Sequence, residues 1–247
     1  MNVPAPFTFI FTCEHGGNRI PAAYRALFTA QQTLLASHRG YDPGALTMAR
    51  DLTNAFNGTL VSAEISRLLV DLNRSLGHPR LFSEATRTLP APERDAIVAH
   101  YYTPYRTQVE RLVEKEISGA RRVLHISAHS FTPELNGHVR RADVGLLYDP
   151  GRAGEVELCA GWKATLARMA PELRVRRNYP YAGKEDGLTS CLRSRFPADV
   201  YLGIELEINQ NIVMAEKKRW TALRALLIES LRMTVAPSRT AQRPVPR

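Results

Sequence analysis

Short β-prone segments alternate with amphipathic helical segments along the chain of 247 residues, and this alternation limits the possible folds more than any other feature. Strands are expected at residues 7–12, 59–65 with an extended continuation at 68–70, 122–129, 144–148, 173–177 and 200–208. Helices are expected at residues 42–56, 93–118, 155–170 and 212–233. Strands separated by helices predict a three-layer α/β fold, with a mainly parallel or mixed central sheet and helices on both faces.

One domain is expected over residues 1–235, because the length suits a single large α/β unit and nothing in the sequence forces a split. The last segment, residues 236–247, is rich in Pro, Arg, Ser and Thr and has no apolar periodicity. Such a composition cannot form a core, so this segment is predicted to be a disordered basic tail.

Several classes of protein are disfavoured by composition. No apolar run approaches the ~18–20 residues that span a bilayer, and the first residues lack the basic and apolar regions of a secretory signal. The three cysteines show no CxxC spacing, which argues against a disulfide framework or a cysteine-rich zinc site. A reducing cytoplasm is therefore the expected location. The sequence does not indicate an oligomeric state.

The chain is basic, with 33 Lys+Arg against 24 Asp+Glu and a formal net charge of +9. Nucleic acid, an anionic membrane and an acidic small molecule are the partners that such a charge suggests. No recognised nucleic-acid module is present, and aromatic residues are not interleaved with the basic doublets, so nucleic acid is disfavoured. We expect instead that Arg67, Arg74 and Arg141 serve a site for a small carboxylate-bearing substrate.

Two segments place histidines at the end of a strand, where sites collect in α/β folds. His15 follows the strand at 7–12 and precedes two glycines, so it is either a zinc ligand or a surface histidine in a plain turn. His125, Ser127 and His129 share one face of the next site-bearing strand. His125 is expected in the core, and His129, at the strand end, is the better metal-ligand candidate.

A third segment, residues 66–74, interleaves Arg67, Asp71, Asn73 and Arg74 with aliphatic residues. An arginine can bind a substrate carboxylate through two parallel hydrogen bonds, or it can pair with an aspartate of its own segment. Both interpretations remain open for these arginines.

A fourth segment, residues 203–210, places Glu205 and Glu207 on one face of a strand. Two buried carboxylates at such spacing repel each other, so one of them needs a proton or a cation as partner. The alternative is a solvated edge strand, which the apolar residues on the opposite face make less attractive.

Seven motifs in sequence order resemble the N-formylglutamate amidohydrolase family, and together they cover residues 7 to 215. They are Cys-Glu-His-Gly-Gly-Asn-Arg-Ile-Pro at 13–21, His-x3-Asp-x-Gly-Ala at 38–45, Ser-Arg-Leu-Leu-Val-Asp-Leu-Asn-Arg at 66–74, His-Ser-Phe-Thr-Pro at 129–133, Asp-Val-Gly-Leu-Leu-Tyr at 143–148, Asn-Tyr-Pro-Tyr-x-Gly at 178–183 and Glu-Leu-Glu-Ile-Asn-Gln at 205–210. Each motif alone is a weak signal, whereas seven in order make a specific match.

This resemblance implies a layout similar to zinc carboxypeptidases and aspartoacylase-like amidohydrolases, with a phosphorylase/hydrolase-like fold and one Zn²⁺ per chain. It implies hydrolysis of an amide whose substrate carries a carboxylate. His15 and His129 match the zinc-binding histidines, and Glu207 matches the general base. Asn73 and Arg74 match the pair that receives the substrate carboxylate, with Arg67 as a further candidate.

The sequence departs from that pattern at two positions. Asn18 stands where the second ligand is expected, and an amide is a poor zinc ligand. The third ligand is then expected from Asp42, with Glu14 as the second candidate, and Glu205 is retained as a further candidate of the site. Ser127 stands where an aspartate is common, so it supplies no charge behind the ligands.

The expected function is zinc-dependent hydrolysis of an N-acyl amino acid such as N-formylglutamate, with Glu207 moving the proton. The enzymatic alternative is a carboxypeptidase-like peptidase, or an amidase acting on another N-acyl amino acid or a cell-wall peptide. A basic nucleic-acid-binding protein is the remote alternative. Loops change substrate preference within such folds, so the motifs leave the substrate open.

Overall fold

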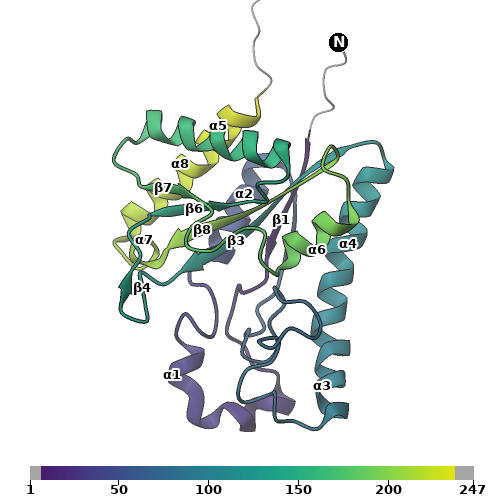
Figure 1. Cartoon of the computed structure of the whole chain (residues 1–247). Helices are drawn as coiled ribbons and strands as arrows, with labels where there is room; N and C mark the ends of the chain where they lie inside the picture. Colours follow the sequence, from purple (N-terminus) through teal and green to yellow (C-terminus); the bar gives the residue numbers. More distant parts are fainter. Residues whose placement is uncertain (1–6, 237–247) are drawn as a thin grey trace, which may run out of the picture.

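The computed structural model describes residues 7–236, and a mixed sheet of six strands lies at its centre (Figure 1). The strand order is β2-β1-β3-β8-β6-β7, and every neighbouring pair is parallel except β6 and β8. A separate antiparallel hairpin is formed by β4 and β5. The strands are β1 (Phe7–Cys13), β2 (Thr59–Ser62), β3 (Arg122–Phe131), β4 (Glu134–Leu135), β5 (His138–Val139), β6 (Val144–Leu147), β7 (Val175–Arg177) and β8 (Tyr201–Asn209).

Helices cover both faces of this sheet. They are η1 (Ala22–Gln31, a 3-10 helix), α1 (Gln32–Leu35), α2 (Ala45–Phe56), α3 (Ala91–Ile97), η2 (Val98–Tyr102, a π-helical turn), α4 (Thr103–Ser118), α5 (Ala153–Met169), α6 (Leu188–Arg195), α7 (Gln210–Val213) and α8 (Lys217–Val235). None of the helices within the described range is long and apolar enough to cross a bilayer.

Alternating side chains on the central strands build two separate cores. On one face, Phe11 and Ile126 pack with buried residues of α2, α5 and α8. On the other face, Ile10 and Val123 pack with buried residues of α4 and α6. Figure 1 shows the same division, with α5 and α8 on one side of the sheet and α4 and α6 on the other. The predicted three-layer α/β fold with a mixed sheet is therefore confirmed.

The chain after β2 differs from the prediction of an extended continuation. Residues 66–74 form turns, because the Leu69 amide donates to the Ser66 carbonyl at 2.9 Å and the Ser66 hydroxyl donates to the Gly40 carbonyl at 2.8 Å. Leu69 and Val70 are still buried, so the aliphatic residues pack into the core from turns rather than from a strand. The polar residues of this segment are thereby free to face one site.

The helix expected from residue 42 begins at Ala45 instead. Gly44 adopts a left-handed backbone with φ of 79°, and a Cβ at this position would lie 2.5 Å from Cγ1 of Val213. Only glycine suits that conformation and that space, so the helix cannot extend back to Asp42. Asp42 consequently lies in a turn, where its carboxylate is available.

The predicted helix at 212–233 is two helices, α7 and α8. Glu216, immediately before α8, has a ψ of 136°, which no helical residue adopts, and this break separates them. The predicted tail at 236–247 lies outside the described residues apart from Ala236, as do residues 1–6 at the other end.

Candidate metal centre and active site

Parallel strands bring the predicted site residues to one edge of the sheet. In β3 and β8, His129 and Glu207 are direct partners in the register. His15 follows β1, which is parallel to β3. The Asp42 amide donates to the His15 carbonyl at 2.9 Å, so the turn before α2 is fixed to the loop after β1. Side chains from four separate parts of the sequence therefore meet at the carboxyl ends of the strands.

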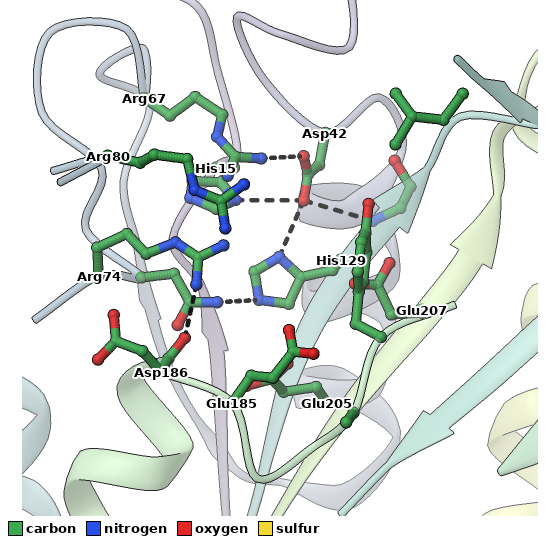
Figure 2. A pocket seen from close by; sticks show the side chains of 15 residues that line it. His15, Asp42, Arg67, Arg74, Arg80, His129, Glu185, Asp186, Glu205 and Glu207 are labelled. Carbon is green, nitrogen blue, oxygen red and sulfur yellow. Dashed lines mark hydrogen bonds and ion pairs between the residues drawn. The ribbon is translucent and has the colours of Figure 1, made fainter. Parts of the chain in front are cut away.

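Three buried side chains, His15, Asp42 and His129, offer ligand atoms that all lie within 4.8 Å of one another. Oδ2 of Asp42 is 3.3 Å from Nδ1 of His15 and 2.9 Å from Nδ1 of His129. Figure 2 shows the two imidazoles turned toward the same carboxylate. Two imidazoles and one carboxylate form a donor set typical of catalytic zinc sites, which leave a further position open. The residues present therefore fit a single zinc ion.

The outer nitrogen of each histidine is held by a second carboxylate. Nε2 of His15 donates to Oδ1 of Asp71 at 2.7 Å, and Nε2 of His129 lies 3.1 Å from Oε2 of Glu14. Such carboxylate partners fix the ring orientation and tautomer of metal-binding histidines. The inner nitrogens face Asp42, and with their outer nitrogens held in this way they would be the atoms that hold a zinc ion.

Glu14, the second candidate ligand, lies behind His129 rather than in the donor set. It also accepts hydrogen bonds from the Ser127 hydroxyl at 2.5 Å and the Tyr105 hydroxyl at 2.8 Å. The charge that Ser127 lacks behind the ligands is thus supplied by Glu14. We did not anticipate this role, because it requires β1 and β3 to be adjacent.

Arg67 links the two sides of the metal centre. Its guanidinium donates to Oδ2 of Asp71 at 2.7 Å and to Oδ1 of Asp42 at 3.5 Å. One oxygen of Asp42 is therefore held by Arg67 while the other faces the histidines (Figure 2). The two interpretations of the arginines in the 66–74 segment apply to different residues. Arg67 forms an ion pair with Asp71 of its own segment, whereas Arg74 does not.

Mutual interactions keep this group of charges stable despite burial. Burial alone would raise the pKa of Asp42, but His15, His129 and Arg67 hold that pKa far below its usual value. Burial would lower the pKa of His129, but its hydrogen bonds with Asp42 and Glu14 raise it well above 6.5. Asp42 is consequently ionised at neutral pH, as a metal ligand must be.

Glu207 differs from the other buried carboxylates. Its Oε2 atom is buried and has no hydrogen-bond partner within residues 7–236. Burial raises the pKa of Glu207 to about 7, Asp42 and Glu205 add to the rise, and His129 opposes it. A buried carboxylate with a free oxygen and a pKa near neutrality, beside a metal-binding group, has the properties of a general base.

A cavity of about 280 Å³ is lined by His15, Asp42, His129 and Glu207, and one of its walls is rich in arginine. Arg67, Arg80 and Arg74 form this wall, and Figure 2 shows them facing the metal centre. Nη1 of Arg74 donates to the Asp186 carbonyl at 2.8 Å, which orients the guanidinium. Asn73 accepts from the Leu188 amide at 2.7 Å through Oδ1. The cavity therefore combines a candidate metal centre, a carboxylate with a free oxygen and three arginines, of which Arg67 and Arg74 are held by hydrogen bonds.

Comparison with known proteins identifies the family. The model of the N-formylglutamate amidohydrolase family matches residues 7–214. The chain belongs to the N-formylglutamate amidohydrolase family. Its members hydrolyse amide bonds, so the chain is a hydrolase of that class. The resemblance carried by the seven sequence motifs is confirmed.

Two solved structures cover almost the whole chain. A gene product from Agrobacterium tumefaciens has 30% sequence identity and a TM-score of 0.80, over 94% of this chain and 91% of that chain. The N-formylglutamate amidohydrolase from Ralstonia eutropha JMP134 has 20% identity and a TM-score of 0.65, over 94% and 95%. No match was found among curated proteins.

Most residues predicted for this amidohydrolase site lie at the cavity. His15, Asp42, Arg67, Asn73, Arg74, His129, Glu205 and Glu207 all line it. Glu205 accepts a hydrogen bond from the Thr189 hydroxyl at 2.7 Å, unlike Glu207 with its free oxygen. His15, His129 and Glu207 lie near the ends of strands, which explains why the sequence pointed to them.

Two predicted residues are not brought to the site. Asn18 is exposed, and its side chain donates to the Leu35 carbonyl at 3.1 Å. Arg141 is exposed and does not line the cavity, so its predicted place in the substrate site needs correction. Its neighbour Arg140 instead donates to the Tyr181 hydroxyl at 3.0 Å. Arg80, and not Arg141, lines the cavity together with Arg67 and Arg74.

The lining residues that the sequence reasoning did not assign to the site include Arg80, Tyr181, Glu185 and Asp186. Tyr181 belongs to a motif that was recognised without a role being assigned to it. The other three lie in loops without a pattern of their own, and only the fold brings these loops to the cavity.

Proposed function

We propose that this chain is a zinc-dependent amidohydrolase that cleaves the amide of a carboxylate-bearing N-acyl amino acid, with N-formyl-L-glutamate as the first candidate. The observation that carries the proposal is the free, buried Oε2 of Glu207 in one cavity with the metal centre and the arginines. Family membership supports the reaction type, and the arginines support an anionic substrate.

His15, Asp42 and His129 would hold the zinc ion, one per chain. Zinc in such a site acts as a Lewis acid toward a carbonyl and makes water nucleophilic near neutral pH. Asp71 and Glu14 orient the two histidines for this role through their outer nitrogens.

Glu207 accepts a proton from the water that attacks the amide carbon, and it later delivers this proton to the departing nitrogen. The carbon–nitrogen bond breaks and the water oxygen remains with the acyl carbon. For N-formyl-L-glutamate, the products are formate and glutamate. A pKa of about 7 suits a group that must both take and release a proton at neutral pH.

Arg74 is the best placed group to bind the carboxylate of the departing amino acid. It forms no ion pair within the described part of the chain, whereas Arg67 is already engaged by Asp42 and Asp71. The Asp186 carbonyl uses one of its donors and leaves the others for the cavity. A fixed guanidinium holds the scissile amide near the metal centre and reduces the entropic cost of the reaction.

A panel of N-formyl and N-acetyl amino acids tests this proposal. The purified protein should release formate from N-formyl-L-glutamate, and N-formyl-L-glutamine serves as the matched substrate with an uncharged side chain. Failure to hydrolyse any N-acyl amino acid of the panel, with zinc bound, would contradict the proposed function.

A further inference from the structure

A second cavity adjoins the catalytic one, and its lining contains neither the candidate zinc ligands nor Glu207. It is a groove of about 710 Å³, within the 300–1,000 Å³ typical of ligand pockets. Arg67, Arg80 and Leu135 line both cavities, so the two spaces share a wall. We call the second cavity the arginine groove, after Arg39, Arg67, Arg80 and Arg87 in its lining.

The arginine groove carries cationic groups that the protein itself does not neutralise. Within residues 7–236, the guanidiniums of Arg39, Arg80 and Arg87 form no hydrogen bond or ion pair, and all three residues are exposed. Glu84 and Glu134 also line the groove, but neither pairs with these arginines. Unpaired guanidiniums in a concave surface favour an anionic group with two or more oxygens.

The position of the arginine groove indicates that the acyl side of the scissile amide faces it. Arg74 and Asp186 line only the catalytic cavity, whereas Arg67 and Arg80 are shared with the arginine groove. Figure 2 shows Arg74 beside Asp186 and Arg67 at the opposite end of the wall, next to Asp42. If the departing amino acid is held at Arg74, the acyl group extends past Arg67 and Arg80 toward the groove. A formyl group has a single carbon atom and is too short to reach the arginine groove.

We infer that the preferred substrate has an extended acyl group with an anionic group of its own, which binds in the arginine groove. This inference rests on the proposed function and narrows it, because it adds a second anionic end to the substrate. The exposed guanidiniums of the groove would also attract a substrate with anionic groups at both ends to the metal centre.

Paired acyl groups of equal carbon number provide the test. The kcat/KM of the zinc-loaded protein is measured for N-glutaryl- and N-pentanoyl-L-glutamate, for N-adipoyl- and N-hexanoyl-L-glutamate, and for N-formyl-L-glutamate. We expect at least one dicarboxylic acyl group to exceed its neutral counterpart by about 10- to 100-fold, the size of one charge-assisted hydrogen bond. Charged acyl groups that never exceed their neutral counterparts would overturn the inference and leave hydrolysis of N-formyl-L-glutamate intact. No hydrolysis of any of the five would overturn both proposals.

Substitutions of arginines in the groove test whether the preference for a dicarboxylic acyl group arises there. Arg39→Gln and Arg87→Gln, which change residues that line only the arginine groove, should bring the ratio of kcat/KM for the dicarboxylic acyl group to kcat/KM for its neutral counterpart down toward one. Arg111→Gln is the matched control, because Arg111 is exposed on α4 and lies outside both cavities. If these two groove variants slow N-formyl-L-glutamate as much as the dicarboxylic substrates, the groove serves the amino-acid side and the inference is wrong.

Discussion

Glu207 of β8 lies directly opposite His129 of β3 in the parallel register of the two strands. This relationship places a buried carboxylate with a free oxygen beside a histidine of the metal centre. The same pairing makes the two groups depend on each other electrostatically, because His129 opposes the rise in the pKa of Glu207 that burial causes. The candidate base and a candidate ligand are therefore positioned by backbone hydrogen bonding of the sheet itself.

Replacing Glu207 by glutamine should abolish proton transfer without removing the metal. The amide keeps the size of the side chain but cannot accept and return a proton, so kcat should fall by about 10²- to 10⁴-fold. Turnover of N-formyl-L-glutamate and zinc content are measured on the same preparation. Normal turnover by Glu207→Gln would show that another group is the base.

Asp71→Asn should weaken zinc binding although Asp71 is outside the donor set. Its carboxylate accepts from Nε2 of His15 and fixes the ring, so loss of its charge should lower zinc affinity by about 10- to 100-fold. Competition with a chelator measures this affinity. Asp143→Asn is the control, because Asp143 is a buried carboxylate that pairs with Arg174 outside the cavity. Equal zinc affinity in both variants would contradict the role of Asp71.

Arg74 and Arg141 should behave differently when each is replaced by alanine. Loss of a charge-assisted hydrogen bond costs about 1.5–3 kcal/mol, so Arg74→Ala should raise KM for N-formyl-L-glutamate by about 10- to 100-fold. Arg141→Ala should leave KM unchanged, because Arg141 is exposed and outside the cavity. Steady-state kinetics of the two variants distinguish these outcomes, and the reverse pattern would restore the prediction made for Arg141 from sequence.

The strand-end residues of the site were predictable, and the reason is geometric. His15, His129 and Glu207 follow or end apolar runs, and parallel strands deliver such positions to one edge of a sheet. The distinction between His125 and His129 also follows from position, since His125 lies in the middle of β3 and is fully buried.

The remaining residues depend on contacts that no local pattern encodes. Asp42 is available because Gly44 stops α2 from starting earlier, and Glu14 supports His129 because β1 and β3 are neighbours. Arg80 and Asp186 lie in loops brought together from distant parts of the chain. Arg141 was chosen for its charge alone, and charge does not determine which way a side chain on an exposed segment points.

His125 makes stability depend on pH in a defined window. Burial lowers the pKa of His125 to about 4, and the neutral ring is bonded to the hydroxyls of Thr12 at 2.8 Å and Tyr201 at 2.7 Å. Because the unfolded chain takes up this proton near pH 6.5, the stabilisation is full above that pH and is lost as the pH falls toward 4. The free energy of unfolding should decrease by up to about 1.4 kcal/mol per pH unit in this range.

Denaturant unfolding at several pH values checks this prediction against His125→Gln. The difference in unfolding free energy between wild type and variant should shrink as the pH falls from 6.5 to 4. The comparison removes the opposite contributions of His15 and His129, whose pKa values are raised. A difference that does not change with pH would show that His125 is not the titrating group.

The most direct test of the account is a zinc titration of metal-free protein, followed by the rate of formate release from N-formyl-L-glutamate. The proposal assigns one zinc ion to His15, Asp42 and His129, so the rate should rise from near zero and reach its maximum at one zinc ion per chain. A full rate before any zinc is added, or a rate that stays at zero after saturation, would contradict the assignment of this site as a zinc amidohydrolase.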